Sequence, residues 1–587
     1  MIKKYNAVKN FDANVSQSFV KGAAILTISM IIVKVFGLLN KIVLTGIFTG
    51  SGVEEDMAAF GMGLYANAYE LFVVIFTVAT GGLPIAISRL VSQNMTQRRY
   101  KDVRLIHKIS VPFFTVMGLV CFAVVFGAAI PYTHYVIHSP YTAYGMMCLA
   151  PTVFFGCLAS AYRGYYEGQR NMFPTAVSEI IEAVVKLVVG SALAYLILWW
   201  GLNAHWDPHY ALAWSVSGAI IGISLSSMLS WLYYFLKFRI QGDGIPKEYY
   251  ESSIDAREKR ETFMTIIKTA LPIAGGALVM SLGSWIDSII IQNVLINLAH
   301  HHEYELMAQY HRFFSPDAFH GDVITIHTNL WGCYSNALTL MQLVTAVTQV
   351  FGSSAMPNVT SAWTKGDKGE LRQSINTVLK LTMMFTLPMA FGLCVLAHPI
   401  MALVYGRSPA IVEIGGNVLT VMGVTTIFTA IITPICSMIN GIGKVKTPMV
   451  LYIICMVVKI GTSWIFVSIP SINIQGATAG SMVSYALICV IGMFLLVKYS
   501  GIVPDFFSTT IKPLIGAVCS SAAAFFSYRL FEPFLPGRLA TIAAVLVAVV
   551  VYMAVLLIIR TFSTEEIKFL PKGEKIAKTL EKFHLIG

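Results

Sequence analysis

The chain has 587 residues, of which 56% are hydrophobic and 12% are charged, and its mean hydropathy is +0.70. Soluble domains carry roughly 25% charged residues, so this composition excludes a soluble globular protein. The net charge of +11 raises the question of nucleic-acid binding, which the placement of the basic residues decides.

Apolar segments of about 20 residues recur along the whole chain, and each is long enough to cross a bilayer as a helix. The strand-like alternation of a membrane β-barrel is absent from the sequence. The chain is therefore predicted to be an all-α integral membrane protein with 14 transmembrane helices. The spans are expected near residues 20–45, 65–90, 109–131, 144–163, 176–199, 211–236, 266–292, 330–355, 374–396, 411–438, 448–469, 476–497, 511–531 and 539–560.

The first span follows a basic N-terminal arm and lacks the short apolar core and cleavage site of a signal peptide, so a retained helix is expected. Basic residues then fill alternate connections, and the others are acidic or neutral, with only Arg312, Arg407 and Arg538 as basic residues. By the positive-inside rule both termini are cytoplasmic, and the charge reports topology rather than nucleic-acid binding. The basic connections contain Lys3, Lys4 and Lys9; Arg98, Arg99, Lys101, Arg104 and Lys108; Arg163 and Arg170; Lys237 to Lys268; Lys365, Lys368 and Arg372; Lys444 and Lys446; Lys498 and Lys512; and Lys568 to Lys582.

Pairs of identical residues recur at a separation of 273 positions, which indicates two equivalent halves that run in the same direction. The pairs are Pro84 and Pro357, Ser88 and Ser361, Gly168 and Gly441, and Lys186 and Lys459. Two pseudo-symmetric six-helix lobes are therefore predicted. The organisation is an N-lobe (1–238), a cytoplasmic linker (239–263), a C-lobe (264–500) with an outer loop (294–329), spans thirteen and fourteen (501–560) and a cytoplasmic amphipathic tail (561–587).

Ionisable residues inside apolar spans are the candidate functional residues, because each costs at least ~2.5–3.5 kcal/mol to insert. Lys34, Lys186 and Lys459 lie near the centres of their spans, and Lys41 and Arg89 lie closer to the ends. Lys41 and Arg89 have a simple alternative, which is snorkelling to the interface. For the other three the alternative is a structural ion pair. The functional interpretation is a cationic cavity that attracts a phosphate or pyrophosphate head group.

Two acidic residues accompany these cations. Glu182 lies four residues before Lys186, so one helical turn can pair them. Asp287 occupies the position in span seven that corresponds to Lys41 in span one. We predict that Asp287 and Lys41 pair when the outer gate closes; a hydrated aspartate at the interface is the alternative.

No catalytic motif is found, neither a GxSxG, an HExxH nor a Walker A loop, so the chain is not predicted to be an enzyme. The cysteines are dispersed without metal-ligand spacing, and no cofactor or metal is expected. The outer loop contains six histidines but no defined metal-site spacing, and a solvated surface loop is favoured. The tail places Ile576, Leu580 and Phe583 on one helical face, which favours contact with the anionic inner leaflet over docking to a partner.

Several segments resemble one family. Gly82-Leu83-Pro84-Ile85-Ala86-Ile87-Ser88-Arg89 resembles the second span of the stage V sporulation protein B group. The segment 162–176, with Glu179, Glu182 and Lys186, resembles its fourth-to-fifth span signature. Ala270-Leu271-Pro272-Ile273 with Asp287, and Gly366-Asp367-Lys368, fit the same group. These proteins belong to the multidrug/oligosaccharidyl-lipid/polysaccharide flippase superfamily, which includes MurJ-type lipid II flippases.

The resemblance implies lobes that open alternately inward and outward, with cavity cations at the substrate pyrophosphate and spans thirteen and fourteen around its polyprenyl tail. The cations assigned to this cavity are Lys34, Lys41, Arg89, Lys186 and Lys459, of which Lys34 and Lys41 match the basic positions that flank a glycine in the family's first span. The family more often has arginine near Lys34 and Lys41, and lysine offers a point charge instead of a bidentate fork. The outer loop 294–329 departs from the family pattern.

The leading hypothesis is a flippase of the bacterial cytoplasmic membrane that moves a polyprenyl-pyrophosphate-linked glycan, such as lipid II, by alternating access. Its expected partners are the lipid-linked oligosaccharide, membrane lipids and a coupling ion, and the expected state is a monomer. One alternative is a cation-coupled multidrug exporter of the same superfamily, which cavity carboxylates would favour. A polytopic glycosyltransferase or ligase is the alternative from another class, and a scaffold without transport is not excluded.

Overall fold

The computed structural model describes residues 19–50, 57–251, 253–320, 323–444 and 446–561. The N-terminal arm and nearly all of the amphipathic tail expected from the sequence lie outside these residues. Within them the chain forms helices and no strand. The chain divides into two compact units, unit 1 with Met1–Asn293 and Asp317–Gly332, and unit 2 with Val294–Pro316 and Cys333–Gly587.

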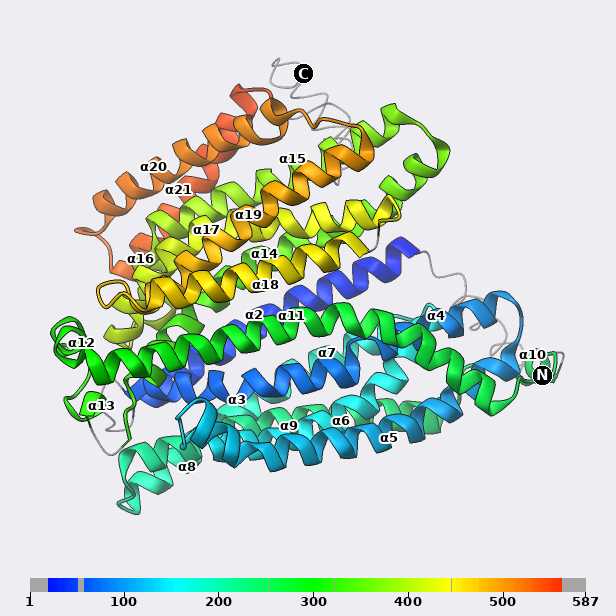
Figure 1. Cartoon of the computed structure of the whole chain (residues 1–587), viewed down its shortest axis with the longest axis horizontal. Helices are drawn as coiled ribbons and strands as arrows, with labels where there is room; N and C mark the ends of the chain where they lie inside the picture. Colours follow the sequence, from blue (N-terminus) through cyan, green and yellow to red (C-terminus); the bar gives the residue numbers. More distant parts are fainter. Residues whose placement is uncertain (1–18, 51–56, 252, 321–322, 445, 562–587) are drawn as a thin grey trace. The chain divides into compact units, whose positions relative to one another are not determined.

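Unit 1 is an all-helical body in which α5, α6 and α9 run side by side (Figure 1). Two of its segments are π-helical and are labelled η1 and η2. Its elements are α2 (Phe19–Thr49), α3 (Met57–Thr80), α4 (Leu83–Thr96), α5 (Tyr100–Pro131), η1 (Tyr132–Val136), α6 (Thr142–Gly168), α7 (Phe173–Val185), η2 (Lys186–Gly190), α8 (Ser191–Asn203), α9 (Pro208–Gln241), α10 (Lys247–Glu251), most of α11 (Lys259–His301) and α13 (Asp317–His320).

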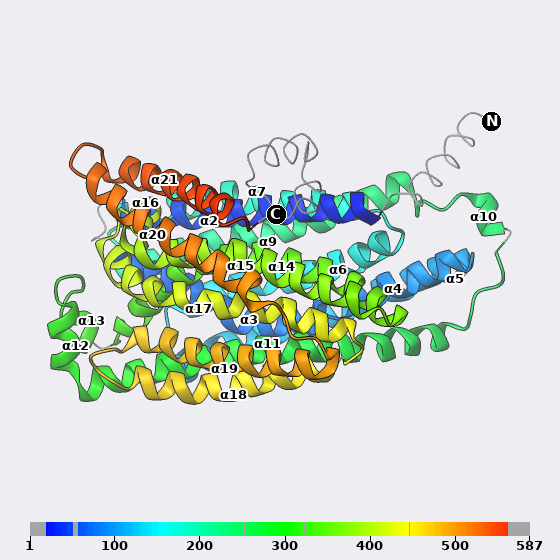
Figure 2. The ribbon, with the colours of Figure 1, turned by 90° about the horizontal axis from the view of Figure 1, so that it is seen from above.

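Unit 2 is also an all-helical body, in which α18 and α19 lie side by side (Figure 2). A group of buried apolar residues lies among α14, α15, α17, α18 and α19. Its elements are α12 (Glu303–Tyr310), α14 (Ile326–Lys365) from Cys333 onward, α15 (Lys368–Val395), α16 (Ala397–Tyr405), α17 (Pro409–Gly441), α18 (Lys446–Val467), α19 (Ile474–Ser500), η3 (Phe507–Ile511), α20 (Lys512–Phe531) and α21 (Gly537–Ile558).

Among the described residues, 13 helical stretches are long and apolar enough to cross a membrane. This confirms the prediction of an all-helical, multi-pass membrane protein. The remaining expected span, 330–355, lies in α14, which is not among the 13, and polar residues such as Asn336 and Gln342 interrupt its apolar character. The count of 14 and the orientation of the termini therefore stay predictions.

The repeat found in the sequence corresponds to a repeated packing contact in each unit. A Cβ atom on Gly168 would come within 2.7 Å of the Ser88 carbonyl oxygen of α4. In unit 2 a Cβ atom on Gly441 would lie 3.1 Å from the carbonyl oxygen of Met356 in α14. Both glycines end a long helix and let an earlier helix, α4 in unit 1 and α14 in unit 2, approach the backbone closely, which explains the glycine at the two positions.

The first part of α11 packs within unit 1, although the sequence analysis placed spans seven to twelve together in the C-lobe. Gly82 at the start of α4 allows the backbone of α11 to come close, because a Cβ atom there would lie 2.7 Å from the Ala270 carbonyl oxygen. Farther along α11, Trp285 donates its indole N–H to the hydroxyl of Tyr132 at 3.1 Å. Both contacts lie within unit 1, which includes the chain up to Asn293, and the lobe boundaries expected from the sequence stay a prediction.

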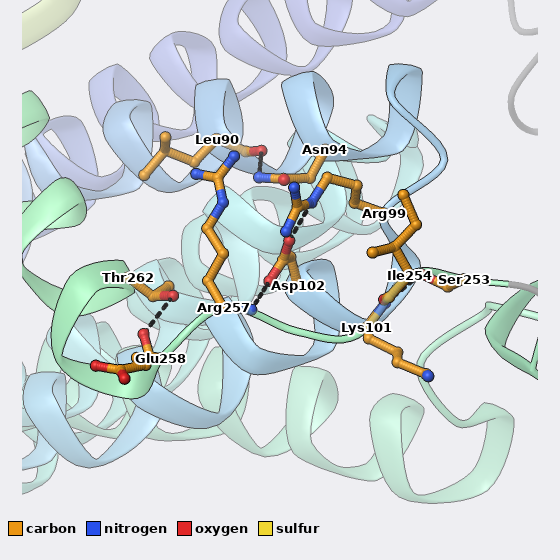
Figure 3. A network of polar contacts seen from close by, with 10 residues as sticks. All are labelled: Leu90, Asn94, Arg99, Lys101, Asp102, Ser253, Ile254, Arg257, Glu258 and Thr262. Atoms are coloured by element: carbon orange, nitrogen blue, oxygen red, sulfur yellow. Dashed lines mark hydrogen bonds and ion pairs between the residues drawn. The ribbon is translucent and has the colours of Figure 1, made fainter.

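The linker is held against the ends of α4 and α5 by a network of polar contacts (Figure 3). Asp102 of α5 pairs with Arg99 at 2.5 Å and accepts a hydrogen bond from the backbone N–H of Arg257 at 2.7 Å. Lys101 pairs with Asp255 at 2.7 Å. Thus the linker is ordered along unit 1, and we refer to these contacts, with the Arg104–Asp243 ion pair, as the linker clamp.

The outer loop of the sequence analysis contains two short helices, α12 and α13. In unit 2, the Tyr310 hydroxyl at the end of α12 donates to Asn473 Oδ1 at 2.6 Å, in the turn between α18 and α19. The Asn473 amide in turn donates to Gln309 Oε1 at 2.8 Å. Part of the loop is therefore docked on unit 2 rather than freely solvated.

Candidate functional site

Lys186 lies at the centre of a cluster of polar and aromatic side chains in unit 1. Its Nζ donates a hydrogen bond to the Tyr69 hydroxyl of α3 at 3.2 Å. The same Nζ lies 5.3 Å from the Tyr69 ring centroid and 5.8 Å from that of Tyr65. A desolvated ammonium gains roughly 2 kcal/mol or more from an aromatic face, so the two rings stabilise a charge that the apolar surroundings disfavour.

Helix α2 supplies the second cation of this cluster. The charge of Lys41 acts on that of Lys186, so the two ammonium groups repel each other. The neighbouring Asn40 donates from Nδ2 to the Tyr65 hydroxyl at 3.5 Å, and the Tyr65 and Tyr69 hydroxyls are 3.4 Å apart. Two like charges held close together within apolar helices are ready to be neutralised by an anion. We call Lys41, Lys186, Tyr65 and Tyr69 the cationic site.

A local change in helix geometry accompanies Lys186. The α-helix α7 ends at Val185, and Lys186 begins the π-helical turn η2. Gly190 at the end of this turn faces Gly222 of α9 with no side chain between them, so the two backbones touch. Single π-helical turns inside helices frequently occur at functional sites. Here the turn changes the register of the helix at the residue that carries the charge.

A second charged group, which we call the Arg163 cluster, lies one helical turn away. Arg163 of α6 approaches Glu179 and Glu182 of α7 at 3.9 Å each. Glu167 on α6 acts on the same guanidinium. The Ser29 hydroxyl of α2 faces Glu179 Oε2 at 3.1 Å. Three carboxylates therefore surround one guanidinium within helices that meet the criteria for membrane spans.

This cluster corrects two interpretations of the sequence. Arg163 was assigned to a basic connection, but α6 continues to Gly168 and places Arg163 between helices. Glu182 was expected to pair with Lys186; its ion pair is formed with Arg163, while Lys186 donates to Tyr69. The charge of Lys186 still acts on Glu182, because only one helical turn separates them.

The other predicted site residues are distributed over both units. Lys34 on α2 and Arg89 on α4 have exposed side chains. Lys459 is partly buried on α18 in unit 2. Asp287 is only 3% exposed and lies on α11 in unit 1, the unit that also holds Lys41. The structure therefore brings Lys41, Lys186 and Glu182 close together, and the outer-gate pair of Asp287 with Lys41 stays a prediction.

Sequence reasoning missed several residues besides Arg163. The tyrosines at 65 and 69 were overlooked because aromatic residues are common in apolar spans. Lys380 is 9% exposed on α15, and the residue 273 positions before it is His107, which is buried and stacks on Phe238 at 4.3 Å between ring centroids. The repeat offset, applied to basic residues of any type, would have found this pair.

No group of three or more His, Cys, Asp or Glu side chains is placed to hold a metal ion in the part of the chain that the structure describes. The site is therefore defined by its fixed charges. It can attract an anion with its lysines, exchange a proton at its carboxylates, and bind hydrogen-bonding groups with its tyrosine hydroxyls.

Comparison with known proteins identifies the sequence family. The model of the family "Polysaccharide biosynthesis protein" matches residues 19–363, and that of the family MatE matches residues 331–465. Stage V sporulation protein B of Bacillus subtilis (strain 168) is 22% identical over 561 residues, which cover 94% of this chain and 98% of that protein. Lipid II flippase MurJ of the same organism is 22% identical over 506 residues, which cover 83% of this chain and 84% of that protein.

A solved structure shares the fold. It is the lipid II flippase MurJ in an inward closed conformation, with a TM-score of 0.62 at 15% sequence identity. The match covers 90% of this chain and 97% of that one. The arrangement of helices is thus shared along almost the whole chain, and the fold class predicted from the sequence is confirmed.

Proposed function

We propose a lipid flippase, starting from the fact that this chain belongs to the polysaccharide biosynthesis protein family, within the multidrug/oligosaccharidyl-lipid/polysaccharide flippase superfamily. Its substrate is a polyprenyl-pyrophosphate-linked glycan, lipid II or a related precursor of wall or capsule. The protein moves the head group from the inner to the outer leaflet of the bacterial membrane by alternating access. We assign it no catalytic reaction.

The observation that carries this proposal is the cationic site of unit 1. Lys41 and Lys186 repel each other, and both lie within apolar spans where an ionised group is costly. A pyrophosphate relieves the repulsion and accepts hydrogen bonds from both ammonium groups. Because the site is built from three helices, α2, α3 and η2, movement of any one of them changes the affinity for the anion.

The named relatives support the proposed flippase function. One of them is named as a lipid II flippase and another as a sporulation protein, and the chain matches each of them along most of its length. The name of the flippase supports a lipid-linked wall precursor as the substrate, because that protein is named for lipid II. The charge of the cationic site suits the pyrophosphate that such precursors share.

The test uses purified protein in proteoliposomes that contain a fluorescent polyprenyl-pyrophosphate glycan. We expect the protein to accelerate loss of fluorescence when a membrane-impermeant quencher is added, because inner-leaflet substrate reaches the outer leaflet. Empty vesicles and vesicles with the Lys186→Gln variant serve as controls. Equal rates in all three preparations would contradict the proposal.

A second candidate function is a cation-coupled multidrug exporter. It is favoured by the match of the MatE family model to residues 331–465 and by the carboxylates of the Arg163 cluster. The same vesicles decide between the two functions when a lipophilic cationic dye replaces the lipid. Transport of the dye without transport of the pyrophosphate lipid would favour the exporter.

A further inference from the structure

The cationic site and the Arg163 cluster contain equal numbers of basic and acidic side chains. The basic residues are Lys41, Lys186 and Arg163, the acidic residues are Glu167, Glu179 and Glu182, and all six lie in unit 1. The two groups are linked electrostatically, because Lys186 acts on Glu182 and Arg163 acts on all three carboxylates. A change of charge at the lysines is therefore felt at Glu182.

The carboxylates differ in how they are supported. Glu167 accepts a hydrogen bond from the Thr175 hydroxyl at 3.2 Å. Glu179 lies 3.1 Å from the Ser29 hydroxyl. Glu182 is stabilised first by the charge of Arg163, 3.9 Å away, then by the Ser230 side chain, and Lys186 makes a smaller contribution. Because Glu182 lies one helical turn before Lys186, it is the carboxylate that feels most directly an anion bound at Lys186.

A buried hydroxyl lies beside Glu182. Ser230 of α9 is fully buried, and its side chain faces Glu182 closely enough to act on it. Its hydroxyl nevertheless makes no hydrogen bond of standard geometry within the described residues. A hydroxyl can accept as well as donate, so Ser230 suits a protonated carboxyl as readily as a carboxylate.

We propose that Glu182 takes up a proton when a pyrophosphate binds at Lys41 and Lys186. This inference rests on the proposed function, and it adds a proton site coupled to the substrate site. Bound pyrophosphate withdraws the lysine charges from Glu182 and brings negative charge near it, so the carboxylate becomes more basic. By linkage, protonation of Glu182 strengthens binding of the anion to the same degree.

Ionisable groups lie near Glu182 on every helix packed against α7. Glu179 and Glu182 lie on α7, Arg163 and Glu167 on α6, Lys186 on η2, and the titratable Tyr234 on α9. Helix α2 contributes the neutral Ser29 at Glu179 and the charge of Lys41. Arginine and tyrosine keep their protons near neutral pH. A proton gained by Lys41 would appear in the wild type and in Glu182→Gln alike.

The experiment measures binding of a short-chain prenyl pyrophosphate, used as a soluble probe, to the purified full-length protein by calorimetry. Titrations in buffers of different ionisation enthalpy give the number of protons taken up on binding, and titrations at several pH values give the affinity. The Glu182→Gln variant removes the proposed proton site. Glu370→Gln, at an exposed glutamate of unit 2, is the matched control, and Glu179→Gln tests the neighbouring carboxylate.

We expect the wild type and Glu370→Gln to take up close to one proton more than Glu182→Gln. The affinity of the wild type and of Glu370→Gln for the probe should fall more steeply with rising pH than the affinity of Glu182→Gln. The difference in slope should be up to about tenfold per pH unit, because linkage gives this value for one proton. Equal proton uptake by wild type and Glu182→Gln would overturn the proposal. Loss of the extra proton in Glu179→Gln but not in Glu182→Gln would also overturn it. Absence of any probe binding to the wild type would overturn the proposed function itself.

Discussion

The two units share a helical plan but differ in where their charges lie. In unit 1, ion pairs occur inside apolar helices, where Arg163 meets Glu179 and Glu182. In unit 2, Lys365 with Glu370 and His302 with Glu305 pair at exposed positions. Unit 2 also carries basic residues within its spans, the buried Lys380 and the partly buried Lys459. Charges are costly within a membrane, so the close group of opposite charges in unit 1 needs a reason.

The two units are alike in their glycine packing contacts but differ in the surroundings of their charged residues. Gly168 and Gly441 make equivalent close contacts in their own units, so the duplicated fold is maintained in both. The repeat mates Lys186 and Lys459 differ in setting, since Lys186 begins a π-helical turn and Lys459 lies within the regular helix α18. Mutations that affect packing should therefore act alike in the two units, and mutations of charge should not.

The largest effect is expected from Lys186→Gln. Loss of the ammonium removes an anion partner in a partly desolvated site, where such truncations cost about 2–5 kcal/mol in binding. Affinity for a prenyl pyrophosphate should fall at least about 30-fold, as measured by calorimetry. Tyr69→Phe removes only the hydroxyl that accepts from Lys186, and a smaller loss is expected.

The matched control for this prediction is Lys459→Gln in unit 2. If the units differ as their charges suggest, Lys459→Gln should weaken binding less than Lys186→Gln does. Equal losses would show that the two lobes share the head group, and the functional contrast between the units would then be wrong.

The next effect concerns stability and should be similar in both units. A methyl group on Gly222 would overlap the backbone of Gly190, and one on Gly480 would lie 2.6 Å from the Ser463 backbone nitrogen. Overpacking typically costs about 1–3 kcal/mol. Gly222→Ala and Gly480→Ala should therefore lower the thermal midpoint by comparable amounts. A large loss for only one variant would mean that the η2–α9 and α18–α19 contacts do not contribute equally to stability.

Much of the fold was predictable from the sequence because it depends on features that extend over many residues. Apolar segments of membrane length and the 273-residue repeat were enough for the helical class and the duplicated plan. The helix ends were not predictable, since α11 extends over 43 residues and α14 over 40, well beyond their apolar parts. Nor did hydropathy indicate that the first part of α11 packs in unit 1, because that depends on Gly82 and its close contact with α11.

The candidate site was predictable only where a charge stood out in an apolar segment. Lys186 was found in this way, and so was Glu182. Arg163 was missed because it lies near the end of its apolar segment, where an arginine is usually in a connection. Tyr65 and Tyr69, the partners of Lys186, lie on α3, which is far from Lys186 in the sequence. The π-helical turn at Lys186 has no sequence signature. These features arise from tertiary contacts, which a single sequence does not contain.

A smaller effect is expected at the linker clamp of unit 1. Arg104 pairs with Asp243, and the Asp243 carbonyl oxygen also accepts from the Gln169 amide at 3.0 Å. Such partly exposed pairs contribute up to about 1 kcal/mol and weaken with salt. Asp243→Asn should lower stability slightly in low salt and hardly at all in high salt. The exposed Lys365 and Glu370 of unit 2 are the comparison, and Glu370→Gln should have even less effect.

The smallest effect is a pH response confined to the linker. The hydrogen bond and charge of Lys101 lower the pKa of Asp255, which lies outside the membrane spans. A lowered pKa in the folded state stabilises the contact above the unfolded value of about 3.9, and the contact is lost as the pH falls through the folded value. Hydrogen exchange at residues 253–257 should therefore be slow at pH 7, after correction for the intrinsic rate, and faster below about pH 4. Asp255→Asn should show the faster exchange at both pH values. Unchanged exchange in wild type on acidification would show that other clamp contacts, such as Asp102 with the Arg257 backbone, hold the linker without this pair.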